Sequence, residues 1–318
     1  MLISIAMATY NGERYIQEQI NSILSQSFTD FELVICDDCS SDKTAEIIKS
    51  YLPNDCRIRL YQNAQNLGFK KNFEKIVSLC NGTYVALCDQ DDIWTENHLE
   101  VLKNEIHTFD CISSNALMVN DKNVPSGITM KDFIPIHVIP KDNEHMFMHE
   151  IYGNIVQGTA SMFSRELLMK ALPIPDCVKY HDWWFALIAC EYNGCKYVDQ
   201  ITLRYRRHND NATQCPTFGI KEALQLLFGN VDVTTRIKSY SETEIALAEL
   251  YKRQLHEQHK KKTLTAQRFY RSLATSKKRI WTFFHYISHY RQIQLDSRKR
   301  FFPFVYRSAL LLFKGIKL

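Results

Sequence analysis

Three carboxylates stand within four residues of the stretch LCDQDDIW (87–94), at Asp89, Asp91 and Asp92. They directly follow an apolar run, TYVALC (83–88), which predicts a buried strand. Because packed like charges repel and raise one another's pKa, such a cluster needs a compensating partner. Mg²⁺ and Mn²⁺ take oxygen ligands and are commonly held by one or two carboxylates plus substrate phosphates. The spacing favours a metal–diphosphate site, with a solvated acidic turn as the alternative.

Other side chains that could do chemistry stand in similar places. Tyr10 and the pair Asp37-Asp38 end two further apolar runs, where a ring and a carboxylate could bind a nucleobase. Asp182 opens the apolar stretch DWWFALIACEY, at the start of a predicted helix that a carboxylate could cap. A basic cluster that suits a diphosphate comprises Arg204, Arg206, Arg207 and His208.

The elements that would position these residues alternate along the first part of the chain. Apolar runs predict strands at 2–10, 31–36, 57–61 and 83–88. Apolar residues at helical spacing predict helices over 16–24, from a cap at Ser40 or Ser41 to Tyr51, and over 69–80. This alternation predicts an α/β fold with a mostly parallel sheet flanked by helices. Ligands of such sheets bind at the carboxyl ends of the strands, where these aspartates stand.

The second half of the chain changes character. Strands are predicted at 156–163 and 196–203, and a helix over 182–192. Beyond Pro216 the pattern becomes helical and basic, which predicts two domains, 1–215 and 216–318. The net charge of +4 divides into +13 from residue 220 onward and −9 before it. Parts of opposite charge indicate different roles, with the basic part facing something anionic.

Composition disfavours several classes of protein. The chain is 45% hydrophobic and 23% charged, as in ordinary globular proteins. No window approaches the roughly 18 apolar residues of a membrane span, and the apolar start lacks a basic leader. Ten scattered cysteines, with only one CxxC at Cys36 and Cys39, fit free thiols in a reducing compartment better than a zinc or redox site. Without a GxGxxG the sequence disfavours a dehydrogenase. We therefore expect a cytoplasmic protein.

Longer motifs carry a family resemblance. The opening stretch SIAMATYNGERYIQEQINSILSQSFTDFELVICDDCSSDKT resembles the family 2 glycosyltransferases. The pattern of that family is a strand ending in Thr-Tyr-Asn, a Ser-Ile-Leu-x-Gln helix and then Asp-Asp-x-Ser-x-Asp-x-Thr. NLGFKKNFEKIV followed by YVALCDQDDIW is similar to its rhamnosyltransferase branch, and QGTASMFSRELL, HDWWFALIA and YRRHNDN continue the resemblance. It covers roughly residues 1–215, whereas the last hundred residues resemble no family.

The resemblance implies a GT-A fold, a nucleotide-diphosphate sugar donor and transfer with inversion at the anomeric carbon. By the family pattern Asp38 binds the nucleobase and Asp37 supports its loop. Asp91 is then the direct metal ligand, and Asp89 assists it while lying nearer the ribose. Asp182 matches the carboxylate that removes the proton of the acceptor hydroxyl. The implied cofactor is Mg²⁺ or Mn²⁺.

The remaining assignments are looser. His208 resembles the residue that completes the metal site, and is otherwise a surface histidine. Asp92 either joins the site or caps the next helix, and Trp94 is expected to pack rather than to stack on a sugar. Ala8 belongs to the donor site and stands where the family often has Pro. Residues that line the nucleotide pocket, or else form a turn and a helix cap, are Asn66, Gly68 and Asn72. Residues that let a donor or acceptor sugar approach the backbone are Gly158 and Thr159.

The basic C-terminal region predicts a membrane partner. It holds the clusters KKK (260–262), KKR (277–279) and RKR (298–300) between apolar patches such as FFPFVYRSALLLF. Basic clusters beside apolar faces suit an anionic lipid surface. The alternative is a helical subdomain packed on the core, and no module for nucleic acid is visible. We expect a protein that is peripheral on the inner face of the cell membrane.

Together the motifs predict a metal-dependent, inverting glycosyltransferase of bacterial surface polysaccharide synthesis, such as O-antigen or capsule. Rhamnose is the leading donor sugar, and the acceptor is lipid-linked or a saccharide. Without Gln-x-x-Arg-Trp a processive synthase is disfavoured. Two alternatives are a non-catalytic nucleotide-sugar scaffold and a sugar nucleotidyltransferase, although ATYNGERY lacks the Gly-rich, basic phosphate loop expected of the latter.

Overall fold

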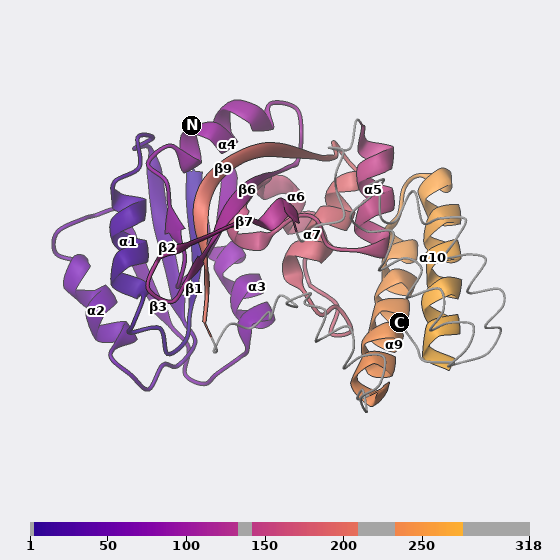
Figure 1. Cartoon of the computed structure of the whole chain (residues 1–318), viewed down its shortest axis with the longest axis horizontal. Helices are drawn as coiled ribbons and strands as arrows, with labels where there is room; N and C mark the ends of the chain where they lie inside the picture. The colour runs from indigo at the N-terminus through magenta and orange to yellow at the C-terminus, as the bar shows by residue number, and fades with distance from the viewer. Residues whose placement is uncertain (1–2, 133–141, 209–232, 276–318) are drawn as a thin grey trace. The chain divides into compact units, whose positions relative to one another are not determined.

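The computed structural model describes residues 3–132, 142–208 and 233–275. The chain forms two compact units, Met1–Arg207 and His208–Leu318 (Figure 1). The predicted domain boundary at 216 lies outside the described residues, a few positions beyond the division between the units.

The first unit is built on one mixed sheet. Its described strands follow the order β3-β2-β1-β4-β8-β6-β9-β5, and β7 pairs with β6 off this path. β1 to β4 are parallel, β8 is antiparallel to β4 and β6, and β9 is parallel to β6. The bounds are β1 Ile3–Thr9, β2 Phe31–Asp37, β3 Ile58–Gln62, β4 Tyr84–Asp89, β5 Ile93–Trp94, β6 Cys111–Asn120, β7 Pro125–Thr129, β8 Ser161–Ser164 and β9 Cys195–Arg207.

The central strands are buried on both faces, which explains their continuous apolar runs. Figure 1 shows α1 and α2 on one side of these strands and α3 on the other. α3, α6 and α7 pack against one another. The predicted α/β architecture is confirmed. The helices are α1 Ile16–Leu24, α2 Thr44–Tyr51, α3 Phe69–Leu79, α4 His98–Ile106, α5 Asn143–Tyr152, α6 Arg165–Ala171 and α7 His181–Cys190.

Two local predictions were wrong. Neither Ser40 nor Ser41 caps α2, which begins at Thr44, because the Ser40 hydroxyl donates instead to Asp37. The predicted strand over 156–163 is mostly not a strand: a 3₁₀ turn covers Gly158–Ala160, and only Ser161–Ser164 forms β8. The backbone N–H groups just before that turn donate to a side chain rather than to a neighbouring strand.

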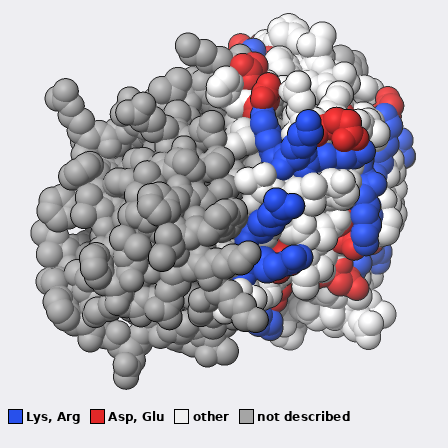
Figure 2. All heavy atoms as spheres, turned by 90° about the vertical axis from the view of Figure 1, so that its right-hand side faces the viewer, with Lys and Arg blue, Asp and Glu red and all other residues white. Residues whose placement is uncertain are grey.

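The second unit contains two long described helices, α9 (Val233–Arg253) and α10 (Glu257–Thr275), which pack together. Leu247 and Leu250 of α9 and Phe269 and Leu273 of α10 are buried, and Arg271 pairs with Glu244 at 2.7 Å. No described helix is long and apolar enough to cross a membrane. Lys and Arg gather in a band in Figure 2, a view from the side on which Figure 1 draws α10. The helical prediction for this region therefore holds over its described part.

Candidate active site

The register of the central strands brings two predicted acidic positions together. Ala8 pairs with Asp89 of β4, and Thr9 pairs with Asp37 of β2, so the two aspartates flank the end of β1. Tyr10 follows directly and is 48% exposed. An exposed ring beside two strand ends is placed to stack on a planar base. The sequence prediction that these residues share one sheet edge is confirmed.

A residue that sequence reasoning missed holds this edge in shape. The Gln90 side chain accepts from the Tyr10 N–H and donates to the Tyr10 carbonyl, both at 2.9 Å. A Cβ on Gly12 would come 2.2 Å from Gln90 Oε1, so Gly12 leaves the space that the amide needs. The sequence offered one signal, the amide side chain of Gln90 between Asp89 and Asp91. Because an amide has both a donor and an acceptor, it can pair with the N–H and C=O of a backbone as a neighbouring strand does.

Asp37 is a structural carboxylate. It is fully buried and accepts hydrogen bonds from the Thr9 hydroxyl at 3.1 Å and from the hydroxyl and N–H of Ser40. These bonds fix the loop that follows β2 against the end of β1. The arrangement is what the predicted supporting role of Asp37 requires.

Asp38 is also buried, and both of its oxygens are engaged by the protein. It accepts from Asn63 Nδ2 at 2.7 Å and from the N–H groups of Leu67 and Gly68 at 2.8 Å each. The carboxylate therefore shapes the 63–68 loop. Its predicted contact with a nucleobase would have to share these oxygens, and Asn63 is a second residue that sequence reasoning missed.

The other predicted pocket residues follow the structural alternative. Asn72 is 1% exposed, donates to the Cys36 carbonyl at 2.8 Å and accepts from Asn63, so it lines the core rather than a pocket. Asn66 accepts from the Gly68 N–H at 2.9 Å in an exposed turn. Gly68 stands directly before α3 with φ +80°, a conformation that favours glycine. This segment is a turn and a helix start.

Asp89 differs from these satisfied carboxylates. Among the described residues no N–H or O–H group donates to its side chain. Burial, and then the charges of Asp91 and Asp182, raise the pKa of Asp89 to about 7. The effect of Asp182 shows that this residue, distant in sequence, faces the same acidic edge. A carboxylate that receives no hydrogen bond from a described donor, beside two others, suits a divalent cation that brings its own diphosphate oxygens.

The metal assignment of His208 gains no support from geometry. Within the described ranges, no group of three His, Cys, Asp or Glu side chains is arranged to hold a metal ion. The fit to a cation rests on Asp89 and Asp91, with substrate oxygens as the remaining ligands.

Asp92 does not cap the following helix. It is 1% exposed, and it accepts from the Thr159 hydroxyl at 2.6 Å and from the Arg206 N–H at 2.9 Å. Burial, with repulsion from Asp91 and Asp89, holds the pKa of Asp92 well above its usual range. α4 begins only at His98, so the predicted capping role is wrong. Asp92 instead ties the acidic loop to the 3₁₀ turn and to β9.

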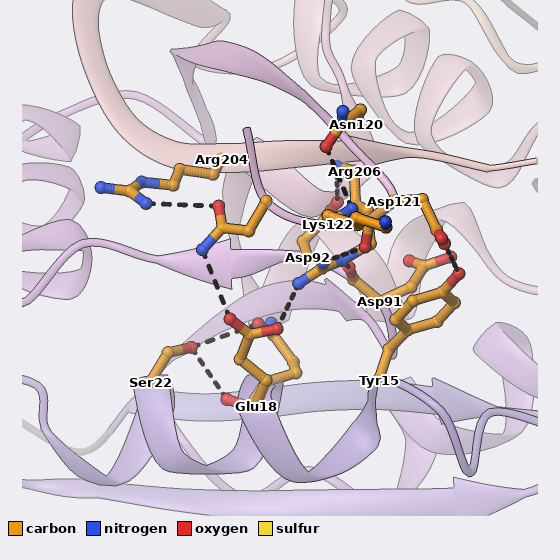
Figure 3. A network of polar contacts seen from close by, with 12 residues as sticks. Tyr15, Glu18, Ser22, Asp91, Asp92, Asn120, Asp121, Lys122, Arg204 and Arg206 are labelled. Carbon is orange, nitrogen blue, oxygen red and sulfur yellow. Dashed lines mark hydrogen bonds and ion pairs between the residues drawn. The ribbon is translucent and has the colours of Figure 1, made fainter. Parts of the chain in front are cut away.

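Arg206 was predicted to bind diphosphate, but its guanidinium is buried and bonded to protein oxygens. Nε donates to the Asp91 carbonyl and Nη1 to the Asp121 carbonyl, at 2.8 Å each, and Nη2 pairs with Glu18. Figure 3 shows these partners gathered around it. Its ring neighbour is Tyr15, 5.0 Å from the guanidinium carbon to the ring centroid. Arg206 therefore fixes the acidic loop through its hydrogen bond to the Asp91 carbonyl.

The neighbouring arginines differ in exposure. Arg204 is exposed and donates to Asn123 Oδ1 at 3.2 Å, whereas Arg207 is half-buried at the end of β9. Their contact with a diphosphate stays a prediction. Trp94 is 3% exposed and packs against His98, with the two rings tilted and their centroids 4.1 Å apart, so its packing role is confirmed.

Asp182 is the second residue of α7, in its first turn, and the N-cap of this helix is Tyr180. Its Oδ2 accepts from the Gly158 N–H at 3.0 Å, and its Oδ1 accepts from the Trp183 N–H at 2.7 Å and Asn154 Nδ2 at 3.3 Å. A Cβ on Gly158 would lie 3.5 Å from the carboxylate. The predicted base and the predicted glycine thus meet, and Asn154 is a further partner that the sequence did not reveal.

Comparison with known proteins identifies relatives. Residues 4–172 match the family model described as glycosyl transferase family 2. The chain is 31% identical over 218 residues to dTDP-rhamnosyl transferase RfbG of Shigella flexneri, covering 64% of this chain and 72% of that protein. It is 34% identical over 126 residues to UDP-Glc:alpha-D-GlcNAc-diphosphoundecaprenol beta-1,3-glucosyltransferase WfgD of Escherichia coli, covering 37% of this chain and 49% of that protein.

Solved structures share the fold. S. aureus TarS 1–349 in complex with UDP-GlcNAc aligns with a TM-score of 0.62 at 19% identity, covering 100% of this chain and 90% of that one. Mannosyltransferase PcManGT from Pyrobaculum calidifontis, in complex with GDP-Man and Mn²⁺, aligns at 0.57 and 14% identity, covering 99% and 81%. The fold is that of GT-A glycosyltransferases. The match of the family model to more than half of the sequence shows that this chain is a glycosyltransferase of family 2.

Proposed function

We propose that this glycosyltransferase moves a sugar from a nucleotide-diphosphate donor to an acceptor hydroxyl, with a divalent cation and with inversion at the anomeric carbon. The observation that supports this proposal most strongly concerns Asp89, at the acidic edge of the sheet. Among the described residues no group donates a hydrogen bond to its side chain, and its pKa is raised beside Asp91 and Asp182. A cation with a diphosphate would relieve that repulsion. The Mn²⁺ complex of PcManGT, on the same fold, supports the choice of metal.

Asp182 serves as the general base in this proposal. Its Oδ2 takes the proton of the acceptor hydroxyl while the acceptor oxygen forms a bond to the anomeric carbon and the bond from that carbon to the diphosphate oxygen breaks. Attack from the side opposite the leaving diphosphate inverts the anomeric centre. The cation, when bound, supplies positive charge that stabilises the departing diphosphate. Asp91 and Asp89 hold the cation, and Tyr10 stacks on the nucleobase of the donor.

The donor that we propose is a dTDP-linked rhamnose, which the similarity to RfbG supports. The proposed acceptor is a lipid-linked or free saccharide of a bacterial surface polysaccharide, which the similarity to WfgD supports, because the name of that enzyme includes a diphosphoundecaprenol-linked sugar. Both relatives match over part of their length, so the substrates of the whole protein are proposals.

We also place the enzyme on the inner face of the membrane through its basic C-terminal region. The support is the charge of +13 after residue 219 and the exposed Lys252, Lys261 and Arg268 on α9 and α10. The predicted inserting patch, 301–313, lies outside the described residues. Full-length protein should pellet with anionic vesicles at low salt and release as salt rises, since each basic residue near the surface is worth about 1 kcal/mol. Pelleting that is indifferent to salt and to lipid charge would contradict this placement.

A single donor screen tests the catalytic proposal. Nucleotide release from a panel of nucleotide sugars is measured with and without Mn²⁺, for the wild type, Asp91→Ala and Asp182→Asn. We expect Asp91→Ala to lose both turnover and metal-dependent donor binding. Asp182→Asn should lose turnover by about 10²-fold or more while binding donor normally. Full turnover of chelator-treated wild type would overturn the metal role, and normal turnover of Asp182→Asn would overturn the base.

A further inference from the structure

The segment 154–158 lies between two carboxylates from different helices. On one side, Glu150 Oε1 accepts from the N–H groups of Ile155 and Val156, at 3.1 Å each. On the other side, Asp182 accepts from the Asn154 side chain and the Gly158 N–H. The segment is therefore a bridge that α5 holds at its middle and that bonds to Asp182 at both ends.

Glu150 is an unusual residue for this place. It is fully buried, and its Oε2 has no hydrogen-bond partner among the described residues. Buried carboxylates without partners are costly, so their presence asks for a reason. A second link joins the same elements, because Trp183 Nε1 donates to the Glu150 carbonyl at 2.6 Å. α5 is thus linked to Asp182 in two ways. One link is the segment 154–158, and the other is Trp183, the residue that follows Asp182 in the sequence.

We propose that Glu150 is a positioning residue for Asp182. It fixes the bridge so that the Asn154 amide and the Gly158 N–H each meet one oxygen of the Asp182 carboxylate. Orienting the carboxylate in this way aims its free lone pairs at the acceptor hydroxyl. The inference rests on the proposed function, in which Asp182 is the base. Misplacing a catalytic group by about 1 Å can cost up to about 10²-fold in rate, so the hold on the bridge affects turnover.

The charge state of Glu150 is consistent with this role. Burial, and to a lesser extent the charge of Asp182, raise the pKa of Glu150 to about 8. At neutral pH the residue is mostly an uncharged acid whose Oε1 still accepts the two N–H bonds. A permanent second charge beside the base is thereby avoided.

The experiment compares two substitutions of one residue. Glu150→Gln keeps a neutral side chain with an acceptor oxygen, whereas Glu150→Met keeps the length but removes the acceptor. We expect Glu150→Met to lower kcat by about 10-fold or more without changing the donor KM, and Glu150→Gln to stay within about 3-fold of the wild type. Glu144→Ala, which removes an exposed carboxylate from the same helix, is the matched control and should not change kcat. A normal kcat in Glu150→Met overturns the proposal.

A double substitution separates this inference from the base assignment. If Glu150 acts through Asp182, adding Glu150→Met to Asp182→Asn should lower the residual rate by less than about 2-fold. Multiplicative losses would show that Glu150 acts elsewhere. A fully active Asp182→Asn would instead refute the base. Should Glu150→Met fail to fold, Asn154→Ala removes one of the two bonds between the bridge and Asp182: it should lower kcat in the wild type but not in Asp182→Asn, and an unchanged wild-type kcat overturns the proposal.

Discussion

Two aspartate pairs stand at the same sheet edge and behave in opposite ways. Asp37 and Asp38, at the end of β2, are buried, and together they accept bonds from two hydroxyl groups, one amide side chain and three backbone N–H groups. Asp89, after β4, receives no bond from a described donor and carries a raised pKa beside Asp91. The protein satisfies the oxygens of the first pair, which shape loops. It offers no such donor to Asp89.

The difference teaches that residue type and strand position do not decide the role of a carboxylate. N–H and O–H donors stabilise the charged form, whereas burial and neighbouring charges oppose it. A carboxylate surrounded by donors therefore stabilises the fold, and one surrounded by carboxylates stores repulsion that a cation can release. Substitutions should reveal this as opposite effects on stability.

The largest contrast is expected between Asp38→Ala and Asp91→Ala. Removing Asp38 leaves three donors without their acceptor, at about 1–3 kcal/mol each. Each kcal/mol shifts Tm by about 2–4 °C in a domain of this size, so Tm should fall by about 10 °C. Asp91→Ala should stay within about 2 °C of the wild type. Thermal unfolding followed by circular dichroism measures both, and equal losses would erase the distinction between the pairs.

A sharper test uses Asp92. It follows Asp91 in the sequence, but, like Asp37 and Asp38, it accepts hydrogen bonds from donors of the protein. Thr159→Val removes the hydroxyl that donates to Asp92 at 2.6 Å and leaves a buried oxygen unpaired. The cost is about 1–3 kcal/mol, or about 5 °C in Tm. Thr159→Ser keeps the hydroxyl and should lose much less. If Val and Ser variants melt together, the hydrogen bond contributes nothing.

Asp89→Asn should change stability in the other direction. The folded pKa of about 7 lies above the ordinary value for Asp, so between those values the folded state holds a proton that the unfolded state has released, and stability falls as pH rises. At pH 8 the ionised carboxylate is fully unfavourable, and Asn should raise Tm by a few °C. Donor with Mn²⁺ should then stabilise the wild type but not the variant. A lowered Tm at pH 8 would place Asp89 among the satisfied carboxylates.

The smallest effect concerns Glu150. One oxygen of its carboxylate accepts two hydrogen bonds and the other accepts none from a described residue, so Glu150 is intermediate between the two kinds of aspartate. Its pKa of about 8 exceeds the ordinary value for Glu, so its contribution to stability is lost progressively as pH rises from about 4.5 to 8. Glu150→Gln removes this titration. Tm should therefore decrease less from pH 5 to pH 8 in the variant than in the wild type. Identical pH profiles would show that Glu150 ionises normally.

The sequence predicted the parallel half of the sheet well, because β1, β2 and β4 are buried runs and amphipathic helices separate the four parallel strands. It also predicted that the acidic positions share one edge, since the carboxyl ends of parallel strands meet. It missed β6, whose polar stretch Ser113–Asn115 is buried in the sheet and interrupts the apolar pattern. It also extended β8 over residues whose N–H groups bond to Glu150.

Side-chain partners were beyond the sequence because they connect distant positions. Asp92 meets Thr159 and Arg206, which are 67 and 114 residues away. Gln90 bonds to the backbone of Tyr10, and Asn63 bonds to the carboxylate of Asp38. No local spacing in the sequence reveals these pairs. The diphosphate prediction for Arg206 used charge alone, and the structure shows that a basic cluster can face inward.

The late position of β9 has a consequence for how the enzyme is made. This strand ends at Arg207, and it supplies both the N–H that Asp92 accepts and the guanidinium that holds the Asp91 carbonyl. Ribosomal synthesis releases the first four parallel strands more than a hundred residues before β9, so a nascent chain can form most of its nucleotide edge early. Its acidic loop gains these holds only when the last strand of the unit arrives. The hydrogen bonds that fix the acidic loop therefore form in a late step of folding, after the parallel strands that flank it.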